Sequence, residues 1–120
     1  MININFLFGK MDIIFKTFLI IIIIDYITGI LKAIYLHKLN SEIGIKGIIK
    51  KIGYLLIIIV AELIDTLHGS SFNIRDIILY MFISNEIISI LENINTIGIK
   101  IPKQIKNMLL NGGENNKSDS

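Results

Sequence analysis

The stretch FLIIIIIDYITGILKAI, residues 18–34, decides the fold, because it combines a long apolar run with a carboxylate. Seven unbroken apolar residues, Phe18 to Ile24, lead directly into Asp25. Residues 13–34 contain fourteen Ile, Leu or Phe side chains. These favour membrane insertion by roughly 4–8 kcal/mol, whereas one central Asp opposes it by about 3 kcal/mol. This balance predicts that the segment forms a transmembrane helix despite the presence of Asp25.

Composition extends this prediction to the whole chain. The 120 residues suffice for one domain, and 52% of them are hydrophobic, with a mean hydropathy of +0.67. The apolar residues come in dense blocks that a soluble globule of this size could not bury. The chain contains no cysteine, which excludes disulfides and thiolate chemistry. The composition is therefore typical of a small membrane protein.

Three apolar blocks are long enough to cross a bilayer, which requires about 20 mostly apolar residues. They are residues 13–34, 48–67 and 74–94. We therefore predict an all-α integral membrane protein with three transmembrane helices. A cleaved signal peptide is the alternative for the first block. Asp25 interrupts its apolar region and no A-x-A cleavage site follows, which favours an uncleaved span.

The distribution of basic residues predicts the orientation. Three spans place the N-terminus and the 68–73 loop on one side, with three basic residues: Lys10, Lys16 and Arg75. Nine lysines belong to the other side, counting the span ends: Lys32, Lys38, Lys46, Lys50, Lys51, Lys100, Lys103, Lys106 and Lys117. The positive-inside rule then puts the N-terminus outside and the C-terminus in the cytoplasm. This asymmetry accounts for the pI near 8.9 without nucleic-acid binding.

Two segments outside the spans have helical patterns. In NSEIGIKGIIKK, residues 40–51, isoleucines recur at helical spacing, so the second helix is expected to begin in the cytoplasmic interface. Pro102 can start a short amphipathic helix that lies either on an anionic leaflet or in water. Its apolar face comprises Ile101, Ile105, Met108 and Leu109. We assign residues 1–110 to the transmembrane domain and residues 111–120 to a disordered polar tail.

Each predicted span carries polar residues along one helical face. Positions four residues apart share a face, so Asp25 lies with Gly29 and Ala33, a small-xxx-small pair that permits close helix approach in lipid. The corresponding stripes comprise Glu62, Asp65 and Thr66 in the second span, and Asn85, Glu86, Ser89, Glu92 and Asn93 in the third. Each helix is thus expected to have a lipid face and a polar stripe.

Depth along the spans predicts which charges can pair. Near the outer surface Arg75 has three acidic candidates: Glu62, Asp65 and Asp76. Asp25 and Glu86 fall near mid-membrane, and we expect no basic residue at that depth. These acids are then protonated and hydrogen-bonded, or they face water inside an assembly of copies. Two interpretations stay open, an inert bundle held together by its acids and a functional polar surface.

The sequence lacks the residues that an enzyme or a metal site would need. His37 and His68 lie singly at the ends of spans, so metal clusters and nucleophilic triads lack their parts. Gly44-x-x-Gly47 lacks the context of a phosphate-binding loop and is expected to mark the turn into the second span. We predict no catalytic residue, no metal and no cofactor.

Four stretches, in order, carry a resemblance to a known family. DYITGILKA (25–33) is similar to an Asp-x-x-x-Gly-x-x-x-Ala first-span motif, and NSEIGIKGIIKK (40–51) to a Ser-x-x-Gly…Gly-x-x-Lys-Lys cytoplasmic loop. Asp65 occupies the position of an acid that closes the second span. NEIISILENINTIGIKIPK (85–103) resembles a Glu-x-x-Ser-Ile-Leu-x-Asn…Gly-x-x-x-Pro-Lys end segment. Over residues 10–110 the chain thus resembles the small holins of the toxin secretion/phage lysis type.

The resemblance implies a role that the spans alone do not. Such holins accumulate in the bacterial cytoplasmic membrane and then assemble into large, non-specific lesions. Through these, a cytoplasmic endolysin reaches the cell wall or a large toxin leaves the cell. We expect the oligomer and hole-lining surface to comprise Asp25, Thr28, Gly29, Ala33, Glu62, Asp65, Glu86, Ser89 and Asn93. We expect four lysines to set the topology and contact the inner leaflet: Lys50, Lys51, Lys103 and Lys106.

The expected partners are the lipid bilayer, further copies of the chain and an antiholin, with the endolysin or toxin only passing through. Two other functions stay open at this point. A small multi-span transporter or channel subunit can have this length and intramembrane acids, although such proteins usually need four spans. An antiholin would bind a holin without making holes.

Overall fold

The computed structural model describes residues 3–69 and 73–114, with side chains described as far as Met108. Within these residues it contains helices and no strand, which confirms the all-α prediction. The helices are α1 (Ile4–Phe8), α2 (Ile13–Tyr35), α3 (Ser41–Leu67), α4 (Ile74–Ile97) and α5 (Lys103–Glu114).

Local sequence signals explain where the long helices begin and end. Asp12 accepts a hydrogen bond from the backbone N–H of Phe15 at 3.1 Å, and Asn40 accepts one from Ile43 at 2.9 Å. Both are N-caps, which satisfy otherwise unpaired amides of the first turn. Gly98 ends α4 in the left-handed conformation, with φ of 104°. The prediction that the second helix begins before its apolar block is confirmed, because α3 starts at Ser41.

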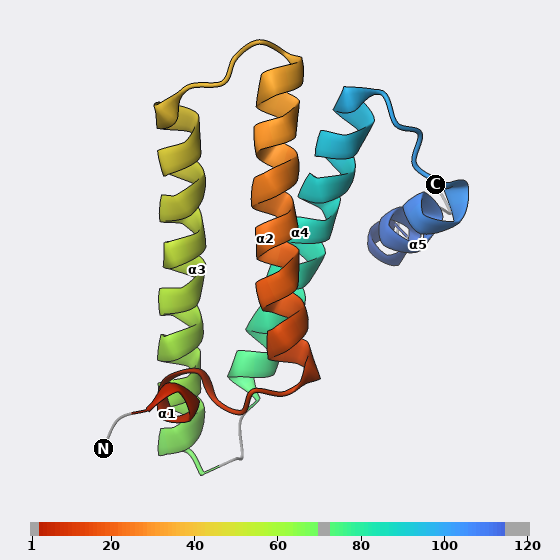
Figure 1. The fold of residues 1–120 in the computed structure, drawn as a ribbon. Coiled ribbons are helices and arrows are strands. Elements are labelled where there is room, and N and C mark those ends of the chain that lie inside the picture. Colours follow the sequence, from red (N-terminus) through yellow and green to blue (C-terminus); the bar gives the residue numbers. More distant parts are fainter. Residues whose placement is uncertain (1–2, 70–72, 115–120) are drawn as a thin grey trace.

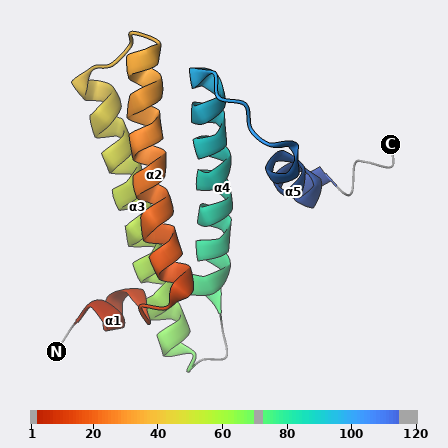
Figure 2. The ribbon, with the colours of Figure 1, turned by 45° about the vertical axis from the view of Figure 1, so that its right-hand side comes forward.

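The three long helices form an elongated bundle (Figure 1). α2 and α3 are antiparallel and joined by a short connection at one end, and α4 runs parallel to α2. α2 packs more extensively against α4 than against α3. The turned view shows α4 beside α2 with α5 apart from the bundle (Figure 2). α5 follows Pro102 as predicted and continues to Glu114, into the predicted tail; residues 115–120 lie outside the described part.

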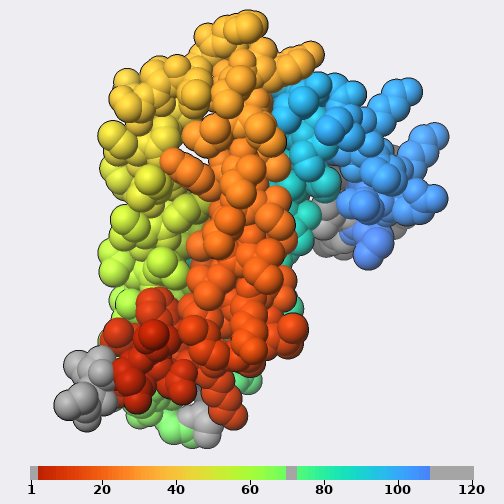
Figure 3. Space-filling model, viewed as in Figure 1, coloured from red at the N-terminus to blue at the C-terminus, as the bar shows by residue number. Residues whose placement is uncertain are grey.

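The apolar core occupies the end of the bundle where α2 begins. Its buried residues are Phe15, Phe18, Ile22, Ile58 and Leu79. Tyr54 stacks on Phe82 with ring centroids 4.2 Å apart, and Phe18 contacts both rings. α1 lies across this end of the bundle, where the space-filling view shows it in front of the end of α3 and beside the start of α2 (Figure 3).

Most large apolar side chains of the described residues lie on the outside. Eight hydrophobic residues are buried, whereas 29 large ones are exposed, most of them Ile or Leu. A water-soluble protein seldom exposes so continuous an apolar surface. Such an apolar surface is typical of a membrane protein.

Two described helices are long and apolar enough to span a membrane, α2 and α4. They match the predicted spans 13–34 and 74–94 closely. The predicted span 48–67 lies within α3 but is too highly charged to be included with them. It contains four charged residues: Lys50, Lys51, Glu62 and Asp65. By length and composition, two of the three predicted spans are therefore supported.

Candidate functional site

A charged cluster joins the three long helices inside the bundle. The ammonium of Lys51 on α3 contacts the carboxylates of both Asp25 on α2 and Glu86 on α4. The side chains of Lys51, Asp25 and Glu86 are only 13%, 9% and 1% exposed. The prediction that no basic residue lies at the depth of the two acids is therefore wrong.

Helix geometry explains how Lys51 reaches them. Lys51 lies ten residues after the start of α3, and Asp25 lies ten residues before the end of α2. At 1.5 Å per residue, both are about 15 Å from the connection that joins these antiparallel helices. A helix that began at Ile48 would place Lys51 in its first turn, whereas α3 begins directly after the N-cap at Asn40. The true start places Lys51 well inside the helix.

Hydrogen bonds between α2 and α4 extend the cluster. The amide of Asn93 donates to the Thr28 hydroxyl at 3.0 Å and to the Asp25 carboxylate at 3.4 Å. Thr28 donates to the backbone carbonyl of Asp25 at 3.0 Å. Asp25, Thr28, Glu86 and Asn93 are all buried. The polar stripes of α2 and α4 thus meet within one chain, so burial of these acids does not require a second copy.

Glu86 is the least satisfied member of the cluster. One of its carboxylate oxygens contacts Lys51, whereas the other, Oε2, is buried and has no hydrogen-bond partner among the described residues. A buried polar atom without a partner raises the energy of the folded state. The cluster therefore holds the three helices together, although Glu86 Oε2 receives no hydrogen bond from the described residues.

A polar cleft of about 250 Å³ opens beside this cluster, between α2, α3 and α4. Asp25, Lys51, Ser89 and Asn93 are among the residues that line it. Ser89 thus faces the same space as Asp25.

The Gly44-x-x-Gly47 pair has a different role from the one predicted. Both glycines lie inside α3 rather than at a turn. A Cβ at either position would approach Tyr26 to 3.2 Å, and the Tyr26 hydroxyl donates to the Gly44 carbonyl at 3.4 Å. The two glycines therefore make room for Tyr26 between α2 and α3.

The opposite end of the bundle is organised around the buried Arg75 of α4. Its guanidinium pairs with both oxygens of Asp12, at 3.1 and 3.3 Å, and with Asp76 at 3.1 Å. It also donates to the backbone carbonyls of Phe8 and Lys10, each at 2.7 Å. The predicted pairing with Asp76 is confirmed, whereas Asp12 was not among the predicted partners. Arg75 thus holds residues 8–12 against the start of α4.

Gly9 permits this close approach. Its φ of +80° is unfavourable for other residues. A Cβ there would lie 2.8 Å from both Arg75 Nε and Glu62 Oε1. Asp65, at the end of α3, accepts hydrogen bonds from the backbone N–H groups of Ile74 and Arg75, each at 2.9 Å. Glu62 and Asp65 therefore belong to this end of the bundle and lie apart from Asp25 and Glu86.

The remaining predicted residues divide between the bundle and its surface. Gly29 faces α4, since a Cβ there would lie 3.8 Å from the Asn93 amide nitrogen. Ala33 is buried. Lys50 is exposed and lies 5.7 Å above the Tyr54 ring. Lys103 and Lys106 are exposed on α5. Among the described residues, no group of three His, Cys, Asp or Glu side chains is arranged to hold a metal ion.

Comparison with known families identifies the group to which this sequence belongs. The sequence model of a family described as the Bacteriophage holin family matches residues 2–111, nearly the whole chain. The chain belongs to the bacteriophage holin family. The match begins before Lys10, so it also includes the N-terminal segment that the motif resemblance left out. Holins permeabilise membranes and are not enzymes.

Relatives of this holin-family chain occur in phages and bacteria. A probable holin of Bacillus phage phi105 is 36% identical over 104 residues, covering 87% of this chain and 76% of the relative. The uncharacterised Listeria innocua protein Lin0175 is 40% identical over 120 residues, covering 96% and 86%. An uncharacterised 14.9 kDa protein of Clostridium perfringens is 40% identical over 106 residues, covering 88% and 80%. No solved structure matches the chain.

We expect Lys51→Met to lower the free energy of unfolding by about 3–5 kcal/mol, because it leaves two buried carboxylates without their cation. The measurement is reversible unfolding in mixed micelles, followed by circular dichroism. Lys50→Met is the matched control, since the neighbouring Lys50 side chain is exposed. The triple variant Asp25→Leu, Lys51→Met, Glu86→Leu should recover most of the loss, because buried ion pairs can often be replaced by apolar residues. Equal stability of Lys51→Met and Lys50→Met would contradict this role of Lys51.

We expect the N-terminal segment to detach at acidic pH. The hydrogen bond from Arg75 lowers the pKa of the Asp12 carboxyl below its usual 3.8. Stability from this pair is therefore fully present above pH 3.8 and is lost as the pH falls through the lower pKa of the folded state. A spin label on Ile4→Cys, a position in α1, should become mobile over that range. Asp12→Asn should make it mobile at pH 7.

The control for this titration is a spin label on Lys38→Cys, at the other end of the bundle. Its mobility should not change over the same pH range. The carboxylates of Asp76 and Glu62 also lie near Arg75, and Asp12→Asn distinguishes the contribution of Asp12 from theirs. An Ile4 label that stays immobile at every pH, or responds identically in Asp12→Asn, would show that the pair does not hold the segment.

Proposed function

We propose that this chain is a holin that accumulates in the bacterial cytoplasmic membrane and assembles into non-specific lesions. Such lesions let an endolysin reach the cell wall, or a large toxin leave the cell. Support comes from family membership, the probable holin of phage phi105 and two helices of membrane-spanning length. The observation that carries the proposal is the Lys51 cluster, a charged group enclosed in a bundle whose outer surface is aliphatic.

In the proposed topology α3 also crosses the membrane, so the chain is multi-pass with its N-terminus outside. The charge of Lys51 is compensated by two carboxylates, which removes the largest obstacle to inserting this helix. Lys50 lies one residue nearer the cytoplasmic end of α3 than Lys51, and its long, exposed side chain can extend toward the headgroups. Glu62 and Asp65 lie near the outer end, where Arg75 and the α4 amides compensate them.

The proposed lesion uses the same polar residues in a second arrangement. In the resting protomer they face other residues of the same chain, and in the lesion they face water along the interface between copies. The residues are Asp25, Thr28, Gly29, Ala33, Glu62, Asp65, Glu86, Ser89 and Asn93. The uncompensated Oε2 of Glu86 supports this exchange, because water can satisfy an atom that the closed bundle leaves without a partner. Lysines on the cytoplasmic side, Lys50, Lys103 and Lys106, would keep that face at the anionic leaflet.

Single-cysteine labelling tests the topology, since the chain has no native cysteine. With three spans, a membrane-impermeant maleimide should label Lys10→Cys and His68→Cys from outside, and Lys38→Cys only after permeabilisation. The comparison of positions 38 and 68 tests α3 directly, because they flank this helix. Labelling of both from the same side would mean that α3 does not cross, and the three-span arrangement would be wrong.

Induced production of the chain alone in bacteria tests the function. We expect an abrupt loss of membrane potential after a delay, with escape of a cytoplasmic reporter enzyme. Asp25→Asn and Asp25→Leu should both advance the onset, because both weaken the resting cluster; Lys46→Gln, at an exposed surface lysine, is the control. All variants are compared at equal amounts of membrane-inserted protein.

The other outcomes of this experiment identify the alternatives. Substrate-specific uptake without leakage of protein would indicate a transporter. Failure to depolarise alone, with delayed lysis when a separate holin is present, would indicate an antiholin. An unchanged onset in both Asp25 variants would mean that the acid only stabilises the bundle.

A further inference from the structure

A second cleft, distinct from the charged cluster, lies between α4 and α5. Its volume is about 480 Å³, and its apolar walls come from Ile88 and Leu91 of α4 and from Ile101. Three lysines also line it, namely Lys100, Lys103 and Lys106. A cleft with an apolar wall next to a group of cations suits an anionic amphiphile, because such a molecule has an apolar chain and a negatively charged headgroup.

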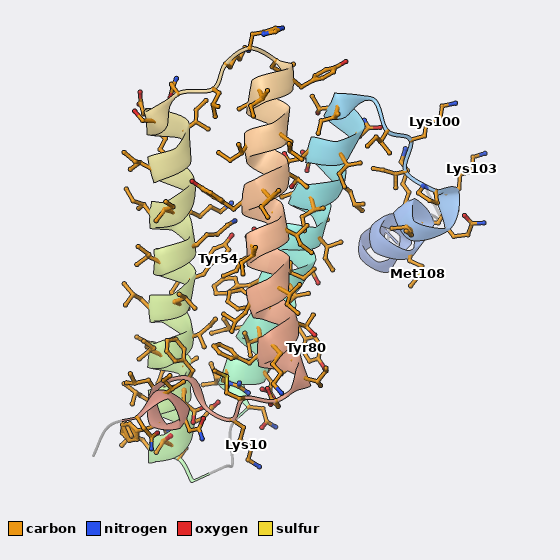
Figure 4. All side chains as sticks on the ribbon, viewed as in Figure 1. Lys10, Tyr54, Tyr80, Lys100, Lys103 and Met108 are labelled. Atoms are coloured by element: carbon orange, nitrogen blue, oxygen red, sulfur yellow. The ribbon has the colours of Figure 1, made fainter. Side chains whose placement is uncertain are left out.

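The lysines and the apolar side of α5 point in opposite directions. Lys100 and Lys103 point toward the end of the bundle where α2 and α3 are joined, whereas Met108 points the opposite way (Figure 4). Met108 is 77% exposed, so α5 presents an uncovered apolar side. In the proposed topology the lysines point to the cytoplasm and Met108 points into the bilayer. α5 is thus oriented as an interfacial amphipathic helix.

Charge and depth favour one class of occupant. The lysines are opposed by a single acid in the lining, Glu92, and Asn95 adds an amide that can donate to a phosphate oxygen. Ile88 lies seven residues before Asn95 on α4, about 10 Å along the helix. An extended acyl chain that begins at the polar end of the cleft would therefore pass Leu91 and reach Ile88.

We propose that the cleft between α4 and α5 binds one anionic phospholipid, with its phosphate among the three lysines and an acyl chain along Leu91 and Ile88. The site rests on the proposed membrane location but is independent of lesion formation. It gives α5 a specific lipid contact in place of a general attraction to the leaflet. The bound lipid would fill the space that separates α5 from the bundle.

Tryptophan quenching by brominated lipid tests the site, because the chain has no native tryptophan. Full-length Ile88→Trp reports on the cleft, and Ile57→Trp, on the exposed face of α3, is the matched control. Both are reconstituted in nanodiscs of phosphatidylcholine with increasing brominated phosphatidylglycerol or brominated phosphatidylcholine. At Ile88→Trp we expect phosphatidylglycerol to be preferred about fivefold or more, since one basic residue near an anionic lipid contributes about that factor. At Ile57→Trp we expect almost no preference.

Charge removal distinguishes a site from a general surface effect. Lys103→Gln combined with Lys106→Gln should reduce the preference at Ile88→Trp to that of the control position. Lys38→Gln combined with Lys46→Gln, which removes two exposed lysines elsewhere, should leave it unchanged.

Three results would overturn the proposal: equal preference at both tryptophans, a preference that survives Lys103→Gln with Lys106→Gln, or no quenching at Ile88→Trp. The last result would mean that protein, such as a second copy, covers the cleft. Quenching at Ile57→Trp shows separately that the chain is in the bilayer, so failure of the lipid site is distinguishable from failure of the membrane proposal.

Discussion

The ion pairs of Lys51 with Asp25 and Glu86 are the constraint on which the bundle depends. In hydrocarbon, an ammonium or a carboxylate without a partner is too costly to bury, so three helices that each carry such a group must align at one level. Aliphatic surfaces cannot impose that alignment, because Ile and Leu pack nearly as well against lipid as against each other. The polar contacts therefore determine which helix faces meet and how far each helix is shifted along its neighbours.

The two halves of the bundle are stabilised in different ways. Where α2 begins, aromatic rings pack in a dry core, and Arg75 fastens residues 8–12 across the end. Toward the α2–α3 connection, charged and hydrogen-bonded groups replace the rings, and a cleft opens beside them. Such a division suits a protein proposed to rest as a closed bundle and then to open.

Burial of the acids within one chain changes the physical basis for assembly. If the carboxylates had faced lipid, the need to cover them would have driven copies together. Because they are already paired, the proposed association of copies needs another source of free energy. Two sources are available: new contacts of these carboxylates with water and neighbouring copies, and packing of the aliphatic faces against each other. The incomplete satisfaction of Glu86 reduces the cost of such an exchange. In the proposed mechanism the resting state is a local minimum, and leaving it requires the Lys51 contacts to break.

By itself, the sequence determined the three long helices, their approximate bounds, the amphipathic pattern after Pro102 and the polar stripes, because these follow from hydropathy, capping and helical period. It did not indicate α1. The family motifs also identified the correct group. Sequence could not place Lys51, since a lysine near the end of an apolar block normally belongs to the interface, and its depth depends on where α3 begins and how α3 is shifted against α2. Nor could it show that Arg75 reaches back to Asp12 across 63 residues, or that Gly44 and Gly47 accommodate Tyr26. Only the tertiary structure decided these contacts, because local patterns specify which face of a helix is polar but not which partner that face meets.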